Sequence, residues 1–493
     1  MAKFSFATQP VLKLLTEEQI RDLHAKALEV LETAGVKFES EEALKILADN
    51  GALVDTAGKT ARIKPDMVMA AIQRAPETVE LFDREGNPAA LLGESSVHFD
   101  PGSSAIKFME SDGITVRKSE ARDLVQISRV NDALGNIALQ STAVTLNDVP
   151  KLIGDSYRLY LLLKNSPKPI ITGAFSVHGV ANMRDMLAAV RGGREVLRQK
   201  PLAVFDICPS PPLKWTHISS QNIIDCARFG LPIESVTMAM PGAATPATLS
   251  GSILVNVAET LSGLVLAQCV NPGTPFIYGS APVQFDMRFG TTPMSAMEAT
   301  MIAAANSQIG KYYGLPTHTY AALSDSKMVD AQAGLETGIS GIVATLAGIN
   351  VISGPGIVDF VNCINLEKLV IDNEICGMAL RLNRGIDCGD EFLALDLICR
   401  LGPGGDYMSQ EHTFKWFKKE PYIPSTLIDR KDRASWVEEG SRSIFERARE
   451  KVQNILEDHQ PLPLDSTREG ELDEVTRGIL ADRQIKELPF SPR

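Results

Sequence analysis

Pro-Leu-Ala-Val-Phe-Asp-Ile-Cys, at residues 201–208, is the stretch that decides the fold. It is an almost uninterrupted apolar run, which is typical of a strand buried on both faces of a parallel sheet. The loop Pro209-Ser210-Pro211-Pro212 ends the strand, because proline and serine favour turns. A helical segment follows, so the stretch predicts one unit of strand and helix.

The same unit recurs along the chain. Six further apolar segments have this character: residues 137–144, 169–175, 232–240, 275–280, 315–320 and 349–354. Seven strands alternating with helices predict an α/β fold, the TIM (β/α)8 barrel, which an eighth strand would close. A doubly wound open sheet is the alternative, but no Gly-x-Gly-x-x-Gly turn after a first strand supports it.

Additions flank the predicted barrel. Residues 11–82 predict helices, the first with a cap near Thr16, and residues 83–117 predict hairpin strands. Trp436 and Ile444 begin an apolar helical stripe that we expect to pack on the outside of the barrel. The expected domains are an N-terminal helical and β-hairpin region (1–129), the barrel (130–405) and a C-terminal loop and helical wrap (406–493).

The distribution of charge separates core from surface. Lys and Arg number 49 against 61 Asp and Glu, and the net charge of −12 disfavours nucleic acid as a partner. Only nine charged residues fall within 235–358, whereas 33 fall within 406–493, so the middle of the chain is the predicted core. Its uncharged runs contain Pro-Gly and Gly-Pro turns, which argues against a membrane span.

The cysteines and the N-terminus indicate the compartment. Seven cysteines stand singly, without a Cys-x-x-Cys pair, so neither a disulfide framework nor a thiolate zinc site is expected. The first ten residues contain no sustained apolar segment and hence no visible secretory signal. We expect a cytoplasmic protein that binds no metal of its own.

Candidate site residues are those just past each predicted strand, where barrel enzymes bind substrate. Asp206 stands inside an apolar strand, where a carboxylate must be paired or functional. Aromatic residues follow several strands; individually they fit a core, but together they suit a quaternary ammonium, whose charge ring faces attract. The candidate substrate-binding residues are Phe175, Asp206, Phe285, Arg288, Phe289, His318, Tyr320 and Phe360.

Three stretches carry a family resemblance. They are Leu323–Glu336, Gly402–Thr413 with the aromatic run Phe414-Lys415-Trp416-Phe417 behind it, and Ala448–Leu462. In this order, and over nearly its whole length, the chain resembles the trimethylamine methyltransferase family of corrinoid-dependent methyltransferases. The resemblance implies a TIM barrel that presents a methylated amine to a separate corrinoid protein, whose cobalamin in the Co(I) state takes the methyl group.

The resemblance also narrows the choice of substrate. Trimethylamine-specific members carry pyrrolysine in the barrel, whereas this sequence has only standard residues. Members without pyrrolysine act on quaternary amines such as glycine betaine, so a betaine-type amine is the expected substrate and a cognate corrinoid protein the expected partner. A betaine carboxylate would need a cationic or hydrogen-bonding partner, for which His318 and Arg288 are the candidates. We also allow for assembly into a homo-oligomer.

Two other functions stay open at this point. A barrel that binds the ligand without catalysis would show affinity but no demethylation. A zinc-dependent methyltransferase for an alcohol or a thiol would contain stoichiometric zinc, although no His-Glu-x-x-His or comparable ligand spacing is present.

Overall fold

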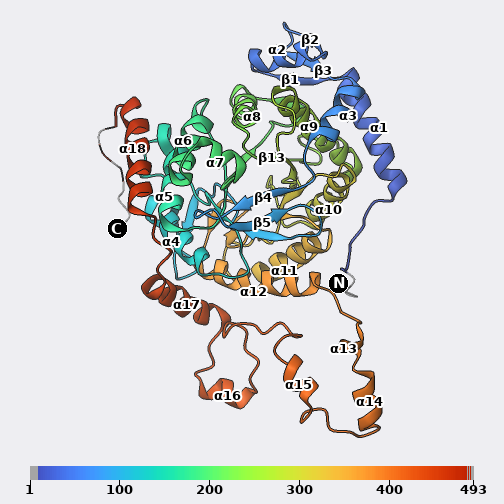
Figure 1. Ribbon diagram of the computed structural model, residues 1–493, viewed down its shortest axis with the longest axis vertical. Coiled ribbons are helices and arrows are strands. Elements are labelled where there is room, and N and C mark those ends of the chain that lie inside the picture. Colours follow the sequence, from blue (N-terminus) through green and yellow to red (C-terminus); the bar gives the residue numbers. More distant parts are fainter. Residues whose placement is uncertain (1–8, 486, 488, 490–493) are drawn as a thin grey trace.

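Eight parallel strands form a closed barrel in the computed structural model, which describes residues 9–485, 487 and 489 (Figure 1). The strands are β6 (His98–Asp100), β9 (Gln140–Ser141), β10 (Ile170–Thr172), β11 (Ala203–Ile207), β13 (Ile233–Thr237), β14 (Phe276–Ser280), β15 (Thr317–Tyr320) and β16 (Val351–Ser353). Each of these strands from β9 to β15 pairs with the next one in the series, and β16 pairs with β6. The ring closes where the Leu139 amide donates to the Phe99 carbonyl at 3.2 Å. The predicted barrel is confirmed.

The eighth strand lies where the sequence predicted a hairpin. β6 belongs to the barrel, so the barrel begins before residue 130, and the assignment of residues 98–100 to a hairpin is wrong. The hairpin prediction for residues 83–117 is confirmed by the antiparallel pair β7 (Lys107–Met109) and β8 (Val116–Lys118). It also holds for β5 (Pro88–Leu92), whose antiparallel partner β4 (Val79–Phe82) lies in the stretch 11–82 that was predicted to be helical, so that prediction is wrong for β4. β6 was concealed because it has three residues, of which only Phe99 is a buried apolar side chain.

Helices surround the barrel. They are α4 (Ala121–Asp132), α5 (Gly154–Asn165), α6 (Gly179–Arg191), α7 (Arg194–Gln199), α8 (His217–Phe229), α9 (Leu249–Val270), α10 (Met297–Tyr312), α11 (Ala331–Leu346) and α12 (Leu366–Asn383), with a 3-10 turn at Lys151–Ile153. α9 is long and apolar enough to cross a membrane by composition alone, but it is 78% buried and packs against α1, α3, α8 and α10. It is the core helix that the uncharged middle of the chain predicted.

The N-terminal end of the barrel is sealed. The β4–β5 hairpin lies across it (Figure 1), with Val79, Leu81 and Leu92 packed in one buried cluster with the inward residues of the strand starts. Those inward residues are Leu139, Ile171, Val204, Ile277 and Val351. Because this end is filled by apolar side chains, only the opposite end of the barrel can admit a ligand.

The N-terminal addition packs outside the barrel. It consists of α1 (Glu17–Thr33), β1 (Val36–Phe38), α2 (Glu41–Asp49), β2 (Leu53–Asp55), β3 (Thr60–Arg62) and α3 (Pro65–Arg74), with β12 (Lys214–Trp215) paired to β1. Thr16 caps α1 in a reciprocal capping box with Gln19, as the sequence predicted. A second small sheet follows the barrel strands β6 and β16: β7 (Lys107–Met109), β8 (Val116–Lys118), β17 (Ile357–Val358) and β18 (Cys363–Ile364).

The C-terminal region has two parts. α17 (Ile444–Asp458) packs against α12 and α4, and α18 (Ser466–Asp482) packs against α5 and α6, so the expected helical wrap is present. The prediction of one apolar helical stripe that begins with Trp436 and Ile444 is wrong for Trp436, because this residue lies in the separate helix α16 (Arg433–Glu438). α13 (Asp390–Leu393), α14 (Leu395–Leu401) and α15 (Glu411–Trp416) stand away from the barrel (Figure 1).

Candidate active site

A cluster of polar side chains fills the barrel interior toward the carboxyl ends of the strands. Residues two apart on a strand point the same way, so Asp206 lies one step beyond the apolar residue Val204 in the sealed end. The same step separates Ser353 from Val351. The carboxyl ends of the strands thus carry a polar layer on top of an apolar one, in the position where barrel enzymes bind substrate.

One side of the cluster is a chain of hydrogen bonds from β15 through β16 to β6. The Ser353 hydroxyl donates to Oδ2 of Asp100 at 2.5 Å, and the Gly102 amide donates to Oδ1 at 2.8 Å. Since the hydroxyl proton is used on Asp100, Ser353 Oγ accepts from Nε2 of His318, 2.9 Å away. Burial lowers the pKa of His318 to about 3, so its imidazole is neutral.

Glu234, on β13, lies beside this chain of hydrogen bonds. Its Oε1 lies 3.4 Å from Nε2 of His318, yet neither carboxyl oxygen has a hydrogen-bond partner among the described residues. Burial, with the charges of Asp206 and Asp100 nearby, raises the pKa of Glu234 well above its usual value. Burial likewise raises the pKa of Asp100 to about 7. The protonated form of Glu234 is therefore favoured, and Asp100 is about half ionised at neutral pH.

Asp206 is the carboxylate of the cluster. Burial raises its pKa to about 6, while hydrogen bonds from Cys208 and Tyr320 and the charge of Arg158 keep it from rising further. Asp206 is ionised for the most part at neutral pH, more fully than Asp100. The thiol of Cys208, an exposed residue, lies 3.6 Å from Oδ1 of Asp206, so the carboxylate lies next to an exposed residue.

Arg158, on α5, brings the positive charge. Its Nη1 donates to the Thr142 carbonyl at 2.9 Å and to Ser104 Oγ at 3.2 Å, and its guanidinium carbon lies 4.6 Å from the centroid of the Phe175 ring. Nη2 has no hydrogen-bond partner among the described residues. Burial lowers the pKa of Arg158 to about 10, which still leaves it charged at neutral pH. It therefore keeps a free donor for an anion.

The predicted residues fall into two places. Asp206, His318 and Tyr320 come together in the cluster: Tyr320 hydrogen-bonds Asp206, and its ring meets that of His318 edge-on at 5.4 Å. Phe175 joins them through Arg158. Since β11 and β15 both end at this edge of the barrel, the grouping follows from the strand assignments.

The other predicted residues lie outside the cluster. Phe285 and Arg288 line a different cavity, of about 610 Å³, together with Asp286, and no residue of the polar cluster lines it. Arg288 is bound to Asp286 at 2.6 Å with 80% of its side chain exposed, so the two candidates for the substrate carboxylate, His318 and Arg288, lie in different places, and the role of Arg288 stays a prediction. Phe289 is 75% exposed, and the Lys327 ammonium lies 3.5 Å from the Phe360 ring centroid.

Four residues of the cluster were missed by the sequence analysis. Glu234 is the one charged residue in the predicted strand 232–240 and could have been found by the argument that singled out Asp206. Asp100 and Ser353 belong to strands of three residues, and Arg158 comes from a helix, where no local pattern marks it. Among the described residues, no group of three or more His, Cys, Asp or Glu side chains is arranged to hold a metal ion.

Comparisons with solved structures support the fold over most of the chain. The monomethylamine methyltransferase of Methanosarcina barkeri superposes with a TM-score of 0.52 at 11% identity, over 92% of this chain and 89% of that one. The hydroxylamine complex of this kind of protein, MtmB, gives a TM-score of 0.52 at 12% identity, over 92% and 90%. At such identities these structures support the fold alone.

Sequence comparison goes further. The family model for trimethylamine methyltransferase matches residues 2–478. A trimethylamine methyltransferase of Desulfitobacterium hafniense is 33% identical over 91% of this chain and 90% of its own length. A glycine betaine methyltransferase of D. hafniense is 32% identical over 96% and 98%. The trimethylamine methyltransferase of Methanosarcina thermophila is 33% identical over 94% and 97%. The chain therefore belongs to the trimethylamine methyltransferase family, and it is a methyltransferase.

Proposed function

We propose that this methyltransferase takes an N-methyl group from a quaternary amine that carries a carboxylate, such as glycine betaine, and transfers it to Co(I) of a separate corrinoid protein. One observation carries the proposal: the Asp206 carboxylate and the Arg158 guanidinium lie around Tyr320 at the open end of the barrel. A betaine has one positive and one negative end, and this pair of opposite charges is complementary to it.

The cationic end is matched by Asp206 and Tyr320. A quaternary ammonium cannot donate a hydrogen bond, so it is held by charge and by ring faces rather than by a directional acceptor. The anionic end is matched by Arg158 Nη2, which has no hydrogen-bond partner among the described residues. Charge-assisted hydrogen bonds from a guanidinium to a carboxylate fix the orientation of a ligand as well as binding it.

The reaction needs orientation more than acid or base. The Co(I) electron pair attacks one methyl carbon as the C–N bond breaks, and the nitrogen keeps the bonding pair and leaves as a neutral tertiary amine. No proton moves. The side chains hold one N-methyl toward the open end of the barrel in a site with little water, which favours loss of the positive charge.

Two further observations favour a betaine over trimethylamine. The chain consists of standard residues throughout, so it has no pyrrolysine, which trimethylamine-specific members of the family carry. Trimethylamine lacks an anionic group, so it could not pair with the buried Arg158 guanidinium, whereas the carboxylate of a betaine could. The proposed site involves Phe175, Asp206, Tyr320 and Arg158, with His318 as a neutral residue that positions its neighbours.

A demethylation panel tests the proposal. The chain is mixed with cob(I)alamin, and glycine betaine, trimethylamine and tetramethylammonium are supplied separately. Methyl transfer is followed by visible absorbance, and the released amine is quantified. We expect methylation with glycine betaine, matched one to one by dimethylglycine. Demethylation of trimethylamine but not of betaine would contradict the proposal, and so would binding of betaine without any transfer.

A further inference from the structure

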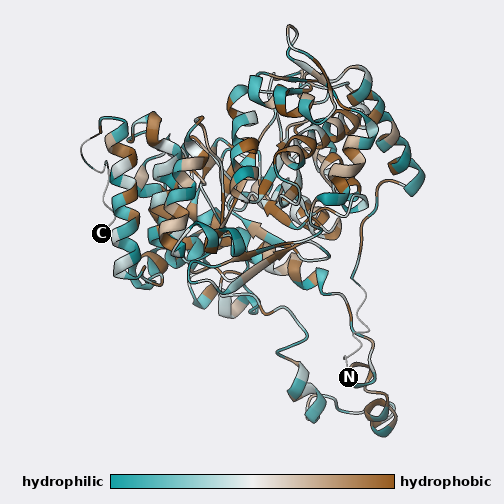
Figure 2. Cartoon of the chain, turned by 45° about the horizontal axis from the view of Figure 1, so that its top comes forward, coloured by the Kyte–Doolittle hydropathy of each residue, from teal (hydrophilic) through white to brown (hydrophobic). Residues whose placement is uncertain are grey.

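Arg158 is a buried cation that forms no ion pair with the described residues. It lies on α5, whose residues from Asp155 to Leu163 are all buried, and only 1% of Arg158 itself is exposed. Figure 2 shows hydrophobic residues gathered around the strands at the centre of the molecule. The hydrogen bonds that Arg158 donates to described residues go to neutral oxygen atoms, and its Nη2 donates none. Since burying a charge costs free energy unless the charge is paired, this free donor indicates an anionic ligand.

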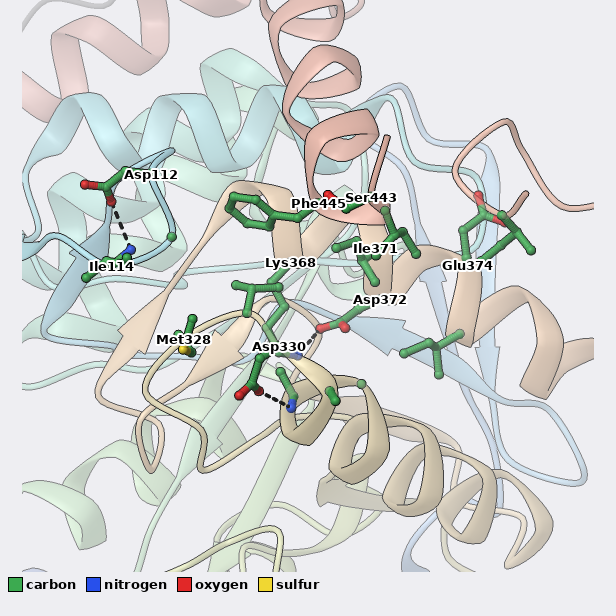
Figure 3. A pocket seen from close by; sticks show the side chains of 18 of the residues that line it. Asp112, Ile114, Met328, Asp330, Lys368, Ile371, Asp372, Glu374, Ser443 and Phe445 are labelled. Atoms are coloured by element: carbon green, nitrogen blue, oxygen red, sulfur yellow. Dashed lines mark hydrogen bonds and ion pairs between the residues drawn. The ribbon is translucent and has the colours of Figure 1, made fainter. Parts of the chain in front are cut away.

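Another buried cation of this chain shows the usual arrangement. Lys368, also 1% exposed, forms an ion pair with Asp372 and donates to Thr337 Oγ1 at 2.8 Å. Figure 3 shows Lys368 and Asp372 turned toward each other beside a cavity of about 640 Å³. Asp372 also accepts the Gly356 amide at 2.7 Å, so both charges are compensated within the protein. Arg158 differs because its anionic partner must come from the substrate, so other contacts have to hold its guanidinium in the right orientation.

The Nη1 group fixes this orientation. It carries two hydrogens, and it donates to the Thr142 carbonyl at 2.9 Å and to Ser104 Oγ at 3.2 Å. Because a guanidinium is planar, two acceptors in fixed positions determine where Nη2 points. The Phe175 ring covers one face of the group, with its centroid 4.6 Å from the guanidinium carbon. Of the two acceptors of Nη1, only the Ser104 hydroxyl belongs to a side chain, so it is the one that a substitution can remove.

The direction of the Ser104 hydroxyl follows from its partners. A guanidinium can only donate, so Ser104 Oγ accepts from Arg158 and its own proton is left for another acceptor. Ser103 Oγ lies 3.1 Å from Ser104 Oγ and supplies that acceptor. The Ser104 hydroxyl therefore accepts from Arg158 while it donates to Ser103, and the two hydrogen bonds together fix its rotation.

Ser104 holds this position in a backbone conformation that serine seldom adopts. Its φ is +67°, in the left-handed region that is unfavourable for residues with a Cβ and that glycine enters freely. Gly102, two residues earlier in the same loop, has φ +77° and is the usual residue for such a turn. A serine kept in a strained conformation where glycine would be unstrained indicates that its side chain has a function.

The loop that carries Ser104 is anchored to the polar cluster. It follows β6, and the Gly102 amide donates to Asp100 Oδ1 at 2.8 Å. The Ser104 amide donates to the Thr142 carbonyl at 3.3 Å, the same carbonyl that accepts from Arg158. Thr142 directly follows β9, so these contacts lie where the first and last strands close the ring. The loop is thus anchored before Ser104 and at Ser104 itself, and it presents the hydroxyl to Arg158 from a fixed support.

We propose that Ser104 is a positioning residue for substrate recognition, whose hydroxyl holds Arg158 so that Nη2 meets the carboxylate of the substrate. In this role Ser104 acts through Arg158 and not on the methyl group. The inference rests on the proposed recognition of a betaine carboxylate by Arg158. Without the hydroxyl, Nη1 keeps the Thr142 carbonyl and the guanidinium can turn about that contact, so its pre-organisation for the carboxylate is lost. The consequence is weaker binding of a substrate that has a carboxylate and unchanged binding of a cation that has none.

Two substitutions separate the hydroxyl from the backbone strain. Ser104→Gly removes the hydroxyl and relieves the strain, so it should lower glycine betaine affinity roughly two- to tenfold without lowering the melting temperature. Ser104→Thr keeps the hydroxyl but places a β-branched residue at positive φ, so it should lower the melting temperature and keep the betaine affinity of the folded molecules. A serine with a merely structural role would give the opposite order, because affinity would follow stability.

The measurements use the full chain. Titration calorimetry gives the affinities for glycine betaine and tetramethylammonium, and circular dichroism melting gives the stability. Tetramethylammonium lacks a carboxylate and should bind the Ser104→Gly variant as it binds the unmodified chain. Ser441→Gly is the matched control, since Ser441 is exposed at φ +55° in the loop between α16 and α17, and it should leave both affinities unchanged. Equal losses for both ligands with Ser104→Gly, no loss with it, or an equal betaine loss with Ser104→Thr would each overturn the proposal.

A double variant separates this inference from the proposed function. Since Ser104 acts through Arg158, Ser104→Gly should lower betaine affinity no further once Arg158→Gln is present. If Arg158→Gln alone has no selective effect on betaine, the proposed recognition by Arg158 fails and the role of Ser104 fails with it. If Arg158→Gln is selective for betaine but Ser104→Gly is not, or if the two losses add in the double variant, only the role of Ser104 fails.

Discussion

Asp206 is the residue on which recognition of a cation depends. A permanent cation stabilises the ionised form of this carboxylate, whose pKa in the free protein is about 6. Binding is therefore fully favoured above that pH and is lost as the pH falls through about 6, by up to about tenfold per unit. The quaternary nitrogen does not titrate, so the pH dependence of binding reflects the ionisation of the protein.

Substitution of Asp206 tests this dependence. Asp206→Asn should weaken glycine betaine binding and flatten its dependence on pH between about pH 5 and pH 8. Titration calorimetry at several pH values, in buffers of different ionisation enthalpy, gives both the affinity and the protons released. An unchanged slope in the Asn variant would place the cation elsewhere in the barrel.

Arg158 is predicted to recognise the carboxylate end of the substrate. Arg158→Gln should lower glycine betaine affinity by roughly 10- to 150-fold, since a hydrogen bond to a charged group contributes about 1.5–3 kcal/mol. Tetramethylammonium, which has no carboxylate, is the matched ligand and should bind the variant as it binds the unmodified chain. Equal losses for both ligands, or a collapsed melting temperature, would mean that the contacts of Arg158 to Thr142 and Ser104 are its whole role.

Tyr320 offers a ring to the cation and a hydroxyl to Asp206. Tyr320→Leu should reduce betaine affinity about two- to thirtyfold, because a ring face contributes about 0.5–2 kcal/mol to a bound cation. Tyr320→Phe keeps the ring and should retain most of the affinity. Phe360→Leu is a useful comparison, since the Lys327 ammonium already occupies one face of that ring. If Phe360→Leu is the more damaging change, the ammonium lies by Phe360 instead.

At the scale of elements, α12 contains a buried ion pair between Lys368 and Asp372, and the hydrogen bond from the Gly356 amide to Asp372 joins this helix to the loop after β16. Lys368→Met leaves Asp372 charged and buried without its partner, which typically lowers the free energy of unfolding by about 3–5 kcal/mol. The double variant with Asp372→Asn removes the second charge but can still accept the Gly356 amide, so it should recover part of the loss. Urea denaturation at one protein concentration measures the free energy of unfolding of both variants. Equal losses in the single and the double variant would show that the ion pair itself contributes little to stability.

The strands and the site were predictable from the sequence to different degrees. Seven barrel strands could be predicted because a strand buried on both faces is a run of apolar residues. β6 has too few residues for such a run. Asp206 and His318 lie inside predicted strands and Tyr320 ends one, whereas Arg158 comes from a helix. The orientation of the Arg288 side chain could not be predicted from the sequence, because it depends on an ion pair with Asp286 in the same loop.

At the scale of the whole molecule, one end of the barrel is closed and the other is open. The β4–β5 hairpin fills the N-terminal end, so substrate and methyl acceptor must share the end at which Asp206 and Tyr320 lie. The loop between β14 and α10 follows a strand at this open end and exposes Met287 at 72% and Phe289 at 75%. Exposed apolar side chains at such a rim are typical of an interaction site.

This arrangement predicts that the rim distinguishes a corrinoid protein from free cofactor. Met287→Ser with Phe289→Ser should lower kcat/KM for a cognate corrinoid protein by about tenfold or more, because buried anchors of this kind contribute about 1–2 kcal/mol each. The rate with free cob(I)alamin should be unchanged, since the cofactor alone needs only the opening. Leu53→Ser, at a residue 60% exposed in the N-terminal addition, is the control. Equal loss with both acceptors would mean that the loop shapes the substrate site, and no loss with either would move the docking surface to another part of the rim.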